Sequence, residues 1–102
     1  MHRSEGEGWS QEILGQLQLG LQVVEPWLVV QRPMAARAET ARHAGIRFLY
    51  VLSGRGVCAH GSREVHVRAG DALMFDANVP HGIWAQEGHA VAHLSVLFSL
   101  RD

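Results

Sequence analysis

The chain has 102 residues, which is enough for one domain and too few for a second hydrophobic core. Its formal net charge is −1 and its nine basic residues, all arginines, are scattered, which excludes a surface that attracts nucleic acid or an anionic membrane. No apolar run approaches the roughly 20 residues of a membrane helix, and no secretory signal begins the chain. We therefore expect a soluble, cytoplasmic protein.

The N-terminal part is predicted to hold a disordered tail, a short helix and then strands. Residues 1–9 are polar and rich in glycine, which is typical of a disordered segment. Ser10 is a suitable helix cap, and the helix would end near Leu17. Apolar residues alternate over residues 17–23, and a further strand is expected over residues 27–30.

The segment 33–45 is open to two interpretations. Its sequence, PMAARAETARHAG, is rich in alanine, so that local propensity favours a helix. The motif comparison given below instead favours an extended segment in the wall of a barrel. We adopt the extended interpretation.

The rest of the chain has the pattern of short antiparallel strands. Turns are expected at residues 53–56 and 69–71, and Gly61 with Ser62 has the pattern of a two-residue hairpin. Short strands separated by turns, with no helix between them, predict a β-sandwich or barrel. The strands are expected at residues 46–52, 57–60, 64–68, 73–75, 83–85 and 90–100.

Three stretches, RFLYVLSGRGV, AHGSREVHVRAGD and ALMFDANVPHGI, together resemble the conserved barrel of the cupin family. The most specific piece is GDALMFDANVPH, in which a Gly-Asp turn is followed by Pro-His. The resemblance covers residues 33–100. It implies an all-β fold, an antiparallel jelly-roll barrel with at most one short N-terminal helix, formed by residues 10–102 as a single domain.

The order of the N-terminal segments, including GLQVVEPWLVV, is similar to the sensor domain of AraC-type transcription regulators. The resemblance implies a barrel that binds a small molecule, generally without a metal. The regulators carry a helix-turn-helix region after the sensor, so the chain is either a free-standing relative or the sensor part of a larger regulator.

The resemblance also identifies the positions at which cupins bind a metal. With Gly54 aligned to the last residue of the first cupin motif, the two histidines and the glutamate of that motif fall on Ala41, His43 and Arg47. The histidine of the second motif is His81. Arg47 cannot be a ligand, because a guanidinium has only donors and repels a cation. His43 and His81 alone would hold a divalent metal ion weakly.

Further histidines would be needed to complete a metal site. His60, His66 and His93 are available on neighbouring strands, although a solvated or hydrogen-bonded strand histidine is the simpler interpretation of each.

The strand over residues 46–52 places Arg47 on the inner face of the barrel if the resemblance holds. A buried arginine is costly unless it is paired. The partner would be internal, with Glu39 or Asp76 as candidates, or it would be the carboxylate or phosphate of a ligand. His81 would meet Arg47 in the same space, and the candidates for the remaining ligand contacts are His43, Phe75 and Trp84.

Three functions are compatible with these residues. The first is a sensor-like module that binds a small anionic organic molecule, most simply a carboxylate. The second is a metal-dependent enzyme (dioxygenase, isomerase or lyase) that uses His43 and His81 with recruited donors. The third is a barrel packed shut. The missing histidine and the arginine at the glutamate position weigh against the enzyme, and the surviving polar residues weigh against the packed barrel.

The outer face of the same strand is also apolar, with Ile46, Phe48, Tyr50 and Leu52. A strand that is apolar on both faces must be covered on both. The cover would be the N-terminal segment or a second subunit, and we expect a homodimer.

Overall fold

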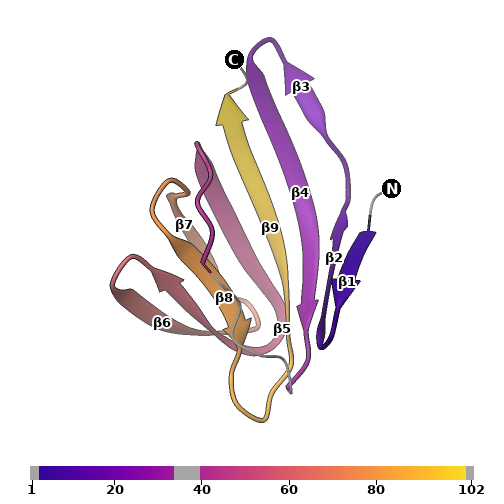
Figure 1. Ribbon diagram of the computed structural model, residues 1–102, viewed down its shortest axis with the longest axis vertical. Helices are drawn as coiled ribbons and strands as arrows, with labels where there is room; N and C mark the ends of the chain where they lie inside the picture. The colour runs from indigo at the N-terminus through magenta and orange to yellow at the C-terminus, as the bar shows by residue number, and fades with distance from the viewer. Residues whose placement is uncertain (1–2, 34–39, 101–102) are drawn as a thin grey trace.

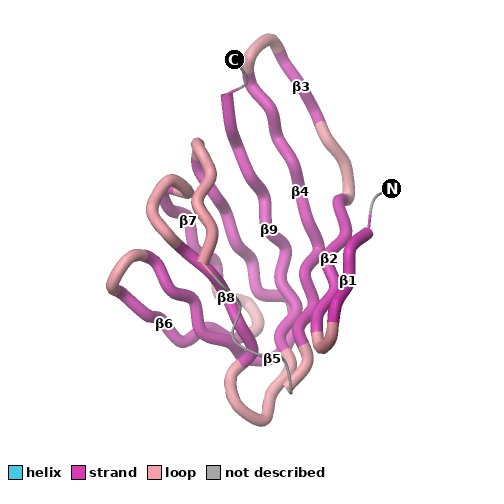
Figure 2. Tube along the Cα trace, viewed as in Figure 1, coloured by secondary structure: helices cyan, strands magenta, loops and turns pink. Residues whose placement is uncertain are grey.

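The computed structural model describes residues 3–33 and 40–100, and these residues form strands, turns and loops without a helix (Figure 2). Within them there is accordingly no helix that could cross a membrane. The strands are β1 (Arg3–Gly6), β2 (Trp9–Ile13), β3 (Leu17–Leu19), β4 (Gln22–Gln31), β5 (Ile46–His60), β6 (Arg63–Arg68), β7 (Ala72–Asp76), β8 (His81–Ala85) and β9 (Val91–Leu100).

The strands pair antiparallel in the order β1-β2-β4-β9-β5-β6, with β3 beside β4 and with β7 and β8 beside β5. Strand β5 joins the two halves of the barrel, because its first half pairs with β7 and β9 and its second half with β6 and β8. Figure 1 shows the sheet curving from β1 and β2 on one side to β6 on the other. The predicted antiparallel jelly-roll barrel is confirmed.

The turn expected at residues 53–56 is wrong, because β5 continues through it. A β-bulge shifts the register of β5 against β9 between Val51 and Ser53, and it bends the strand from one half of the barrel into the other. Gly54 has a φ of 81°, and a Cβ atom there would collide with the carbonyl oxygen of Ala90. The glycine therefore allows a close approach of two strands rather than a chain reversal.

The hairpin predicted at Gly61 and Ser62 is confirmed. His60, the last residue of β5, pairs with Arg63, the first residue of β6, so only two residues make the turn. Gly61 has a φ of 61°, a conformation that glycine adopts without strain.

The helix expected from Ser10 to Leu17 is also wrong. Strand β2 begins at Trp9 and pairs with β4 along its whole length. Residues 3–6 of the expected tail form β1, which pairs with β2, while residues 1–2 lie outside the described part. The backbone groups at the edge of β4 offer hydrogen-bond partners to a whole strand, and this pairing outweighs the local capping signal of Ser10.

Strand β4 runs through Pro26, where a separate strand was expected to follow. Pairing with β2 ends at Trp27, and pairing with β3 starts at Val24, so Pro26 faces the connection between β2 and β3. Its carbonyl accepts a hydrogen bond from the backbone N–H of Leu14 (2.8 Å). A proline has no N–H to donate, and at this break none is required.

Residues 34–39, including the candidate partner Glu39, lie outside the described part of the chain. Residues 41 and 43 pair with other parts of the barrel, which agrees with the extended interpretation of the segment 33–45. Ala41 forms an antiparallel bridge with His81, and the N–H of His43 donates to the carbonyl of Ala77 (2.8 Å). This segment lies against β8 and brings His43 towards His81.

The alternation of β5 separates two faces as predicted. Leu49 and Val51 point inward and are only 3% and 2% exposed, whereas Ile46 and Leu52 point outward and are 49% and 48% exposed. The outer face extends over β7, β5, β9 and β4 in rows of paired residues that are uncharged except for Asp76, which pairs with Ile46 at the end of β7. The rows are Met74–Phe48–Val96–Pro26, Tyr50–Leu94–Leu28 and Ile46–Phe98–Val24.

The described N-terminal strands do not cover this outer face, because they extend the sheet sideways from β4. A wide apolar face with a single charge at its margin is typical of an interface between subunits. We propose that a second copy of the chain packs against it.

Sedimentation or light scattering at about 50 µM should then show a dimer. Introducing charge by Tyr50→Glu or Met74→Glu should give a monomer, because each residue lies exposed within this face. Val65→Glu is the matched control, since Val65 is also exposed but lies on β6 outside the face. A parent protein that is monomeric at this concentration would contradict the proposal.

Candidate ligand-binding cavity

The inner faces of the sheet enclose a cavity in two adjoining parts of about 180 Å³ and about 390 Å³. Arg47, Ala41, Gln11 and Val29 line both parts, so the two parts share a wall. The smaller part is completed by Gln31, Leu49, His81, Gly82, Ile83 and His93, and the larger one by Glu25, Trp27, His43, Ser95 and Leu97.

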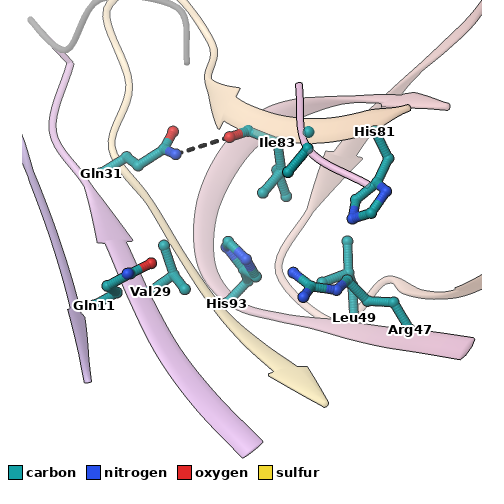
Figure 3. Close-up of a pocket in the computed structure, with 10 residues that line it drawn as sticks. Gln11, Val29, Gln31, Arg47, Leu49, His81, Ile83 and His93 are labelled. Atoms are coloured by element: carbon teal, nitrogen blue, oxygen red, sulfur yellow. Dashed lines mark hydrogen bonds between the residues drawn. The ribbon is translucent and has the colours of Figure 1, made fainter. Parts of the chain in front are cut away.

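Arg47 points into the cavity from β5, as the motif alignment implied (Figure 3). Its Nε atom is buried and has no hydrogen-bond partner, and the described residues include no ion pair to its guanidinium. Asp76 does not pair with it, because Asp76 lies opposite Ile46 and accepts a hydrogen bond from the N–H of Asn78. Burial lowers the pKa of Arg47, since desolvation disfavours the charged form.

His81 enters the cavity from the start of β8 and is 4% exposed. Its Nδ1 lies 2.9 Å from the carbonyl oxygen of Val79, to which it donates, while its Nε2 is buried without a partner. Burial lowers the pKa of His81 most strongly, the hydrogen bond to Val79 raises it, and the charge of Arg47 lowers it, so that the pKa lies below its ordinary value. The ring is therefore neutral at pH 7.

His93 is the most deeply buried of the cavity histidines, at 2% exposure. Burial, assisted by the charge of Arg47, lowers its pKa to about 4, and its Nδ1 has no partner. The expectation of a solvated or hydrogen-bonded strand histidine is wrong here. The alternation of β9 places His93 inward together with Val91 and Ser95, and that sequence pattern was the available signal.

Gln31 and Ser95 were not identified from the sequence. The Nε2 of Gln31 donates to the carbonyl of Ile83 (2.7 Å), and its Oε1 is buried and unpaired. The Oγ of Ser95 is also buried and unpaired. Both residues stand at inward positions of their strands, and the pairing of β4 with β9 brings them to the same cavity.

The remaining histidines contribute little or nothing to the lining of the cavity. His43 is exposed and lines only the larger part of the cavity, with its ring centroid 5.8 Å from that of His81. Partial burial and then Arg47 lower its pKa, which Glu25 raises. The Nε2 of His60 lies 3.0 Å from the carbonyl oxygen of Asp76, and His66 is exposed on β6, as expected for both.

Phe75 and Trp84 do not line the cavity, in contrast to the prediction. The ring of Phe75 packs against His81 at a centroid distance of 5.0 Å. Trp84 is buried with Val57 and Ala59 on the other face of β8. Positions 81 and 84 are three positions apart in sequence, an odd difference, so their side chains leave a strand on opposite faces.

A metal ion does not fit the described donors. A divalent ion requires three or four protein ligands, and residues 3–33 and 40–100 contain no group of three His, Cys, Asp or Glu residues placed to share one. The charge of Arg47 in the same cavity opposes a cation.

The cavity instead gathers buried polar atoms that lack a partner among the described residues. All of these atoms belong to residues that line the cavity: Gln31 Oε1, Arg47 Nε, His81 Nε2, His93 Nδ1 and Ser95 Oγ. Because a buried unpaired polar atom is costly, a polar molecule bound in the cavity would be stabilised by them.

Solved structures similar to this chain share its fold. A Cupin_2 domain of an XRE family transcriptional regulator from Enterobacter cloacae matches with a TM-score of 0.78 and 15% identity, covering 93% of this chain and 99% of that one. A cupin superfamily protein from Desulfitobacterium hafniense matches with a TM-score of 0.73 and 17% identity, covering 97% and 83%. The iron(II) protein HppE matches with a TM-score of 0.74 and 21% identity over 89% of this chain and half (50%) of its own.

No curated protein matches the chain. The family model described as the cupin domain matches residues 27–98, which include every cavity residue except Gln11 and Glu25. The chain therefore belongs to the cupin family.

Proposed function

We propose that this cupin binds a small anionic organic molecule, most simply a carboxylate, inside its barrel. The observation that carries the proposal is the guanidinium of Arg47, which faces the cavity with no hydrogen bond or ion pair to any described residue. A buried cation without a counter-charge is unfavourable, and a carboxylate accepts two parallel hydrogen bonds from a guanidinium.

The charge balance of the cavity supports this proposal. His81 and His93 have lowered pKa values and are neutral at pH 7, so Arg47 supplies the positive charge of the smaller part. Glu25 lines only the larger part. The apolar side chains of Leu49 and Ile83 would contact the rest of the ligand.

The comparisons are compatible with a sensor-like role. The cupin domain of the XRE family regulator matches this chain over nearly the whole of both, so a barrel of this size occurs within a regulator. HppE, whose structures hold iron(II) or cobalt(II), represents the alternative of a metal-dependent enzyme. The donors described above do not fit a metal, so we favour the binding module.

Arg47→Ala should weaken the binding of short carboxylates such as butyrate about 30-fold, equivalent to about 2 kcal/mol for a lost charge-assisted contact. Arg47→Lys should recover only part of the affinity, because an ammonium cannot form the two-pronged contact. Isothermal titration or NMR titration measures both. Arg55→Ala is the matched control on the same strand, since Arg55 does not line the cavity. Equal affinities of the Arg47→Ala variant and the parent would contradict the proposal.

Protein purified without a chelator should contain far less than one divalent metal ion per chain. Two imidazoles leave most of the coordination of an ion to water, so any bound ion is easily removed. His81→Ala should change the metal content little. Elemental analysis showing nearly one ion per chain, lost in His81→Ala, would favour the enzyme.

The stability of the fold should decrease in acid. His93 has a pKa of about 4 in the folded protein and 6.5 in an unfolded chain, so the unfolded state binds more protons between these values. The stabilisation is complete above pH 6.5 and falls by about 3 kcal/mol as the pH approaches 4. Arg47 and His81 line the cavity with His93, and the lowered pKa of His81 acts in the same direction.

Urea denaturation of the parent and of His93→Leu from about pH 7.5 to pH 4.5 tests this expectation. The variant should lose less stability than the parent over this range. His66→Leu, at an exposed position, serves as the control and should follow the parent. An identical pH dependence of parent and His93→Leu would show that His93 is not responsible.

A further inference from the structure

We infer that the ligand carries a hydrogen-bond donor, most simply a hydroxyl group, close to its anionic group. This inference rests on the proposed function and specifies the class of ligand. The unpaired polar atoms of the cavity divide into hydrogen-bond donors and hydrogen-bond acceptors, and the inference follows from this division.

His81 presents an acceptor to the cavity. The carbonyl oxygen of Val79 can only accept, so the Nδ1 of His81, 2.9 Å away, must carry the hydrogen. In the neutral ring the other nitrogen then has no hydrogen. The buried and unpaired Nε2 of His81 therefore offers a lone pair.

Gln31 presents a second acceptor by the same reasoning. The carbonyl oxygen of Ile83 accepts a hydrogen bond at 2.7 Å, so the side-chain atom of Gln31 that faces it must be the amide nitrogen (Figure 3). The remaining atom is the carbonyl Oε1, which is buried without a partner.

Arg47, by contrast, can only donate. Figure 3 shows the side chains of Arg47, His81 and His93 pointing into the same cavity, with Gln31 at its other side. A carboxylate accepts hydrogen bonds and has none to give. It would therefore satisfy Arg47 and leave the Nε2 of His81 and the Oε1 of Gln31 unpaired, at the cost of desolvating both.

A hydroxyl group fits these acceptors better than an ammonium group does. An ammonium would introduce a second cation into the part of the cavity that holds Arg47, and the carboxylate that could offset it, Glu25, lines the larger part. A hydroxyl donates one hydrogen bond without a charge. The fitting ligand class is thus a hydroxylated organic acid.

The test compares four acids of one size: butyrate, 2-hydroxybutyrate, 3-hydroxybutyrate and 2-aminobutyrate. The better of the two hydroxy acids should bind the parent about tenfold more tightly than butyrate, the effect of one buried hydrogen bond. The amino acid should bind no more tightly than butyrate. His81→Phe should reduce the preference for the hydroxy acid, because the hydroxyl donates its one hydrogen bond to the Nε2 of His81, while the exposed control His66→Phe should retain it.

A second measurement tests the acceptor directly and requires no variant. Nitrogen-15 NMR of the histidine rings should show His81 with its hydrogen on Nδ1. Its Nε2 signal should shift when the hydroxy acid is added and much less with butyrate. A hydrogen found on Nε2 would overturn the inference.

The outcomes distinguish the two proposals. Suppose that butyrate and the hydroxy acids bind the parent with equal affinity and that Arg47→Ala abolishes the binding of all of them. The ligand then needs no hydrogen-bond donor, whereas the proposed anion site at Arg47 is supported. A clearly tighter amino acid would likewise overturn the choice of a hydroxyl. If none of the four acids binds, the proposed function itself fails, and the inference fails with it.

Discussion

The interior of the barrel is organised around one electrostatic constraint, the partial burial of the cation of Arg47 without a counter-charge among the described residues. Its inward neighbours along β5, Leu49 and Val51, are almost fully buried and offer it no counter-charge. The cation acts on the titratable groups around it, because it contributes to the lowered pKa of both His81 and His93. The smaller part of the cavity therefore combines one positive charge with neutral imidazoles, a combination suited to an anion with polar substituents.

Strand β5 connects this interior to the surface. Its alternation points Arg47 into the cavity and Phe48 and Tyr50 onto the apolar outer face, so adjacent residues serve the proposed ligand site and the proposed subunit contact. The bulge next to Gly54 then carries the strand into the other half of the barrel, where it pairs with β8 beside His81. Arg47 and His81 thus meet because one strand bends at a glycine and not because they are close in sequence.

The sequence predicted those parts of the site that lie in a recognisable motif. The motifs and strand alternation predicted Arg47 and His81 inside an antiparallel barrel, and both line the cavity. The alternation of side chains along a strand would also have excluded Trp84 from the cavity, because it places Trp84 on the face opposite His81. Gln31 and His93 had no motif, and they come together only through the register of β4 against β9, which periodicity in one strand cannot specify. The false helix at Ser10 has a similar origin, since a free sheet edge outweighed a local capping signal.

The same residue that interrupts the cupin metal motif is the one on which the proposed anion site rests. At the position where the cupin motif has a glutamate this chain has Arg47, which replaces a negative ligand by a positive donor and reverses the local charge. Ala41, at the first histidine position, removes a second ligand, yet its backbone bridge still holds His81 in place. The hydrogen bond to Val79 leaves the Nε2 of His81 as the ring nitrogen with a lone pair, and this atom is buried without a partner. A barrel that keeps this histidine while reversing the charge beside it holds the donor and the acceptor that the proposed hydroxy acid would require.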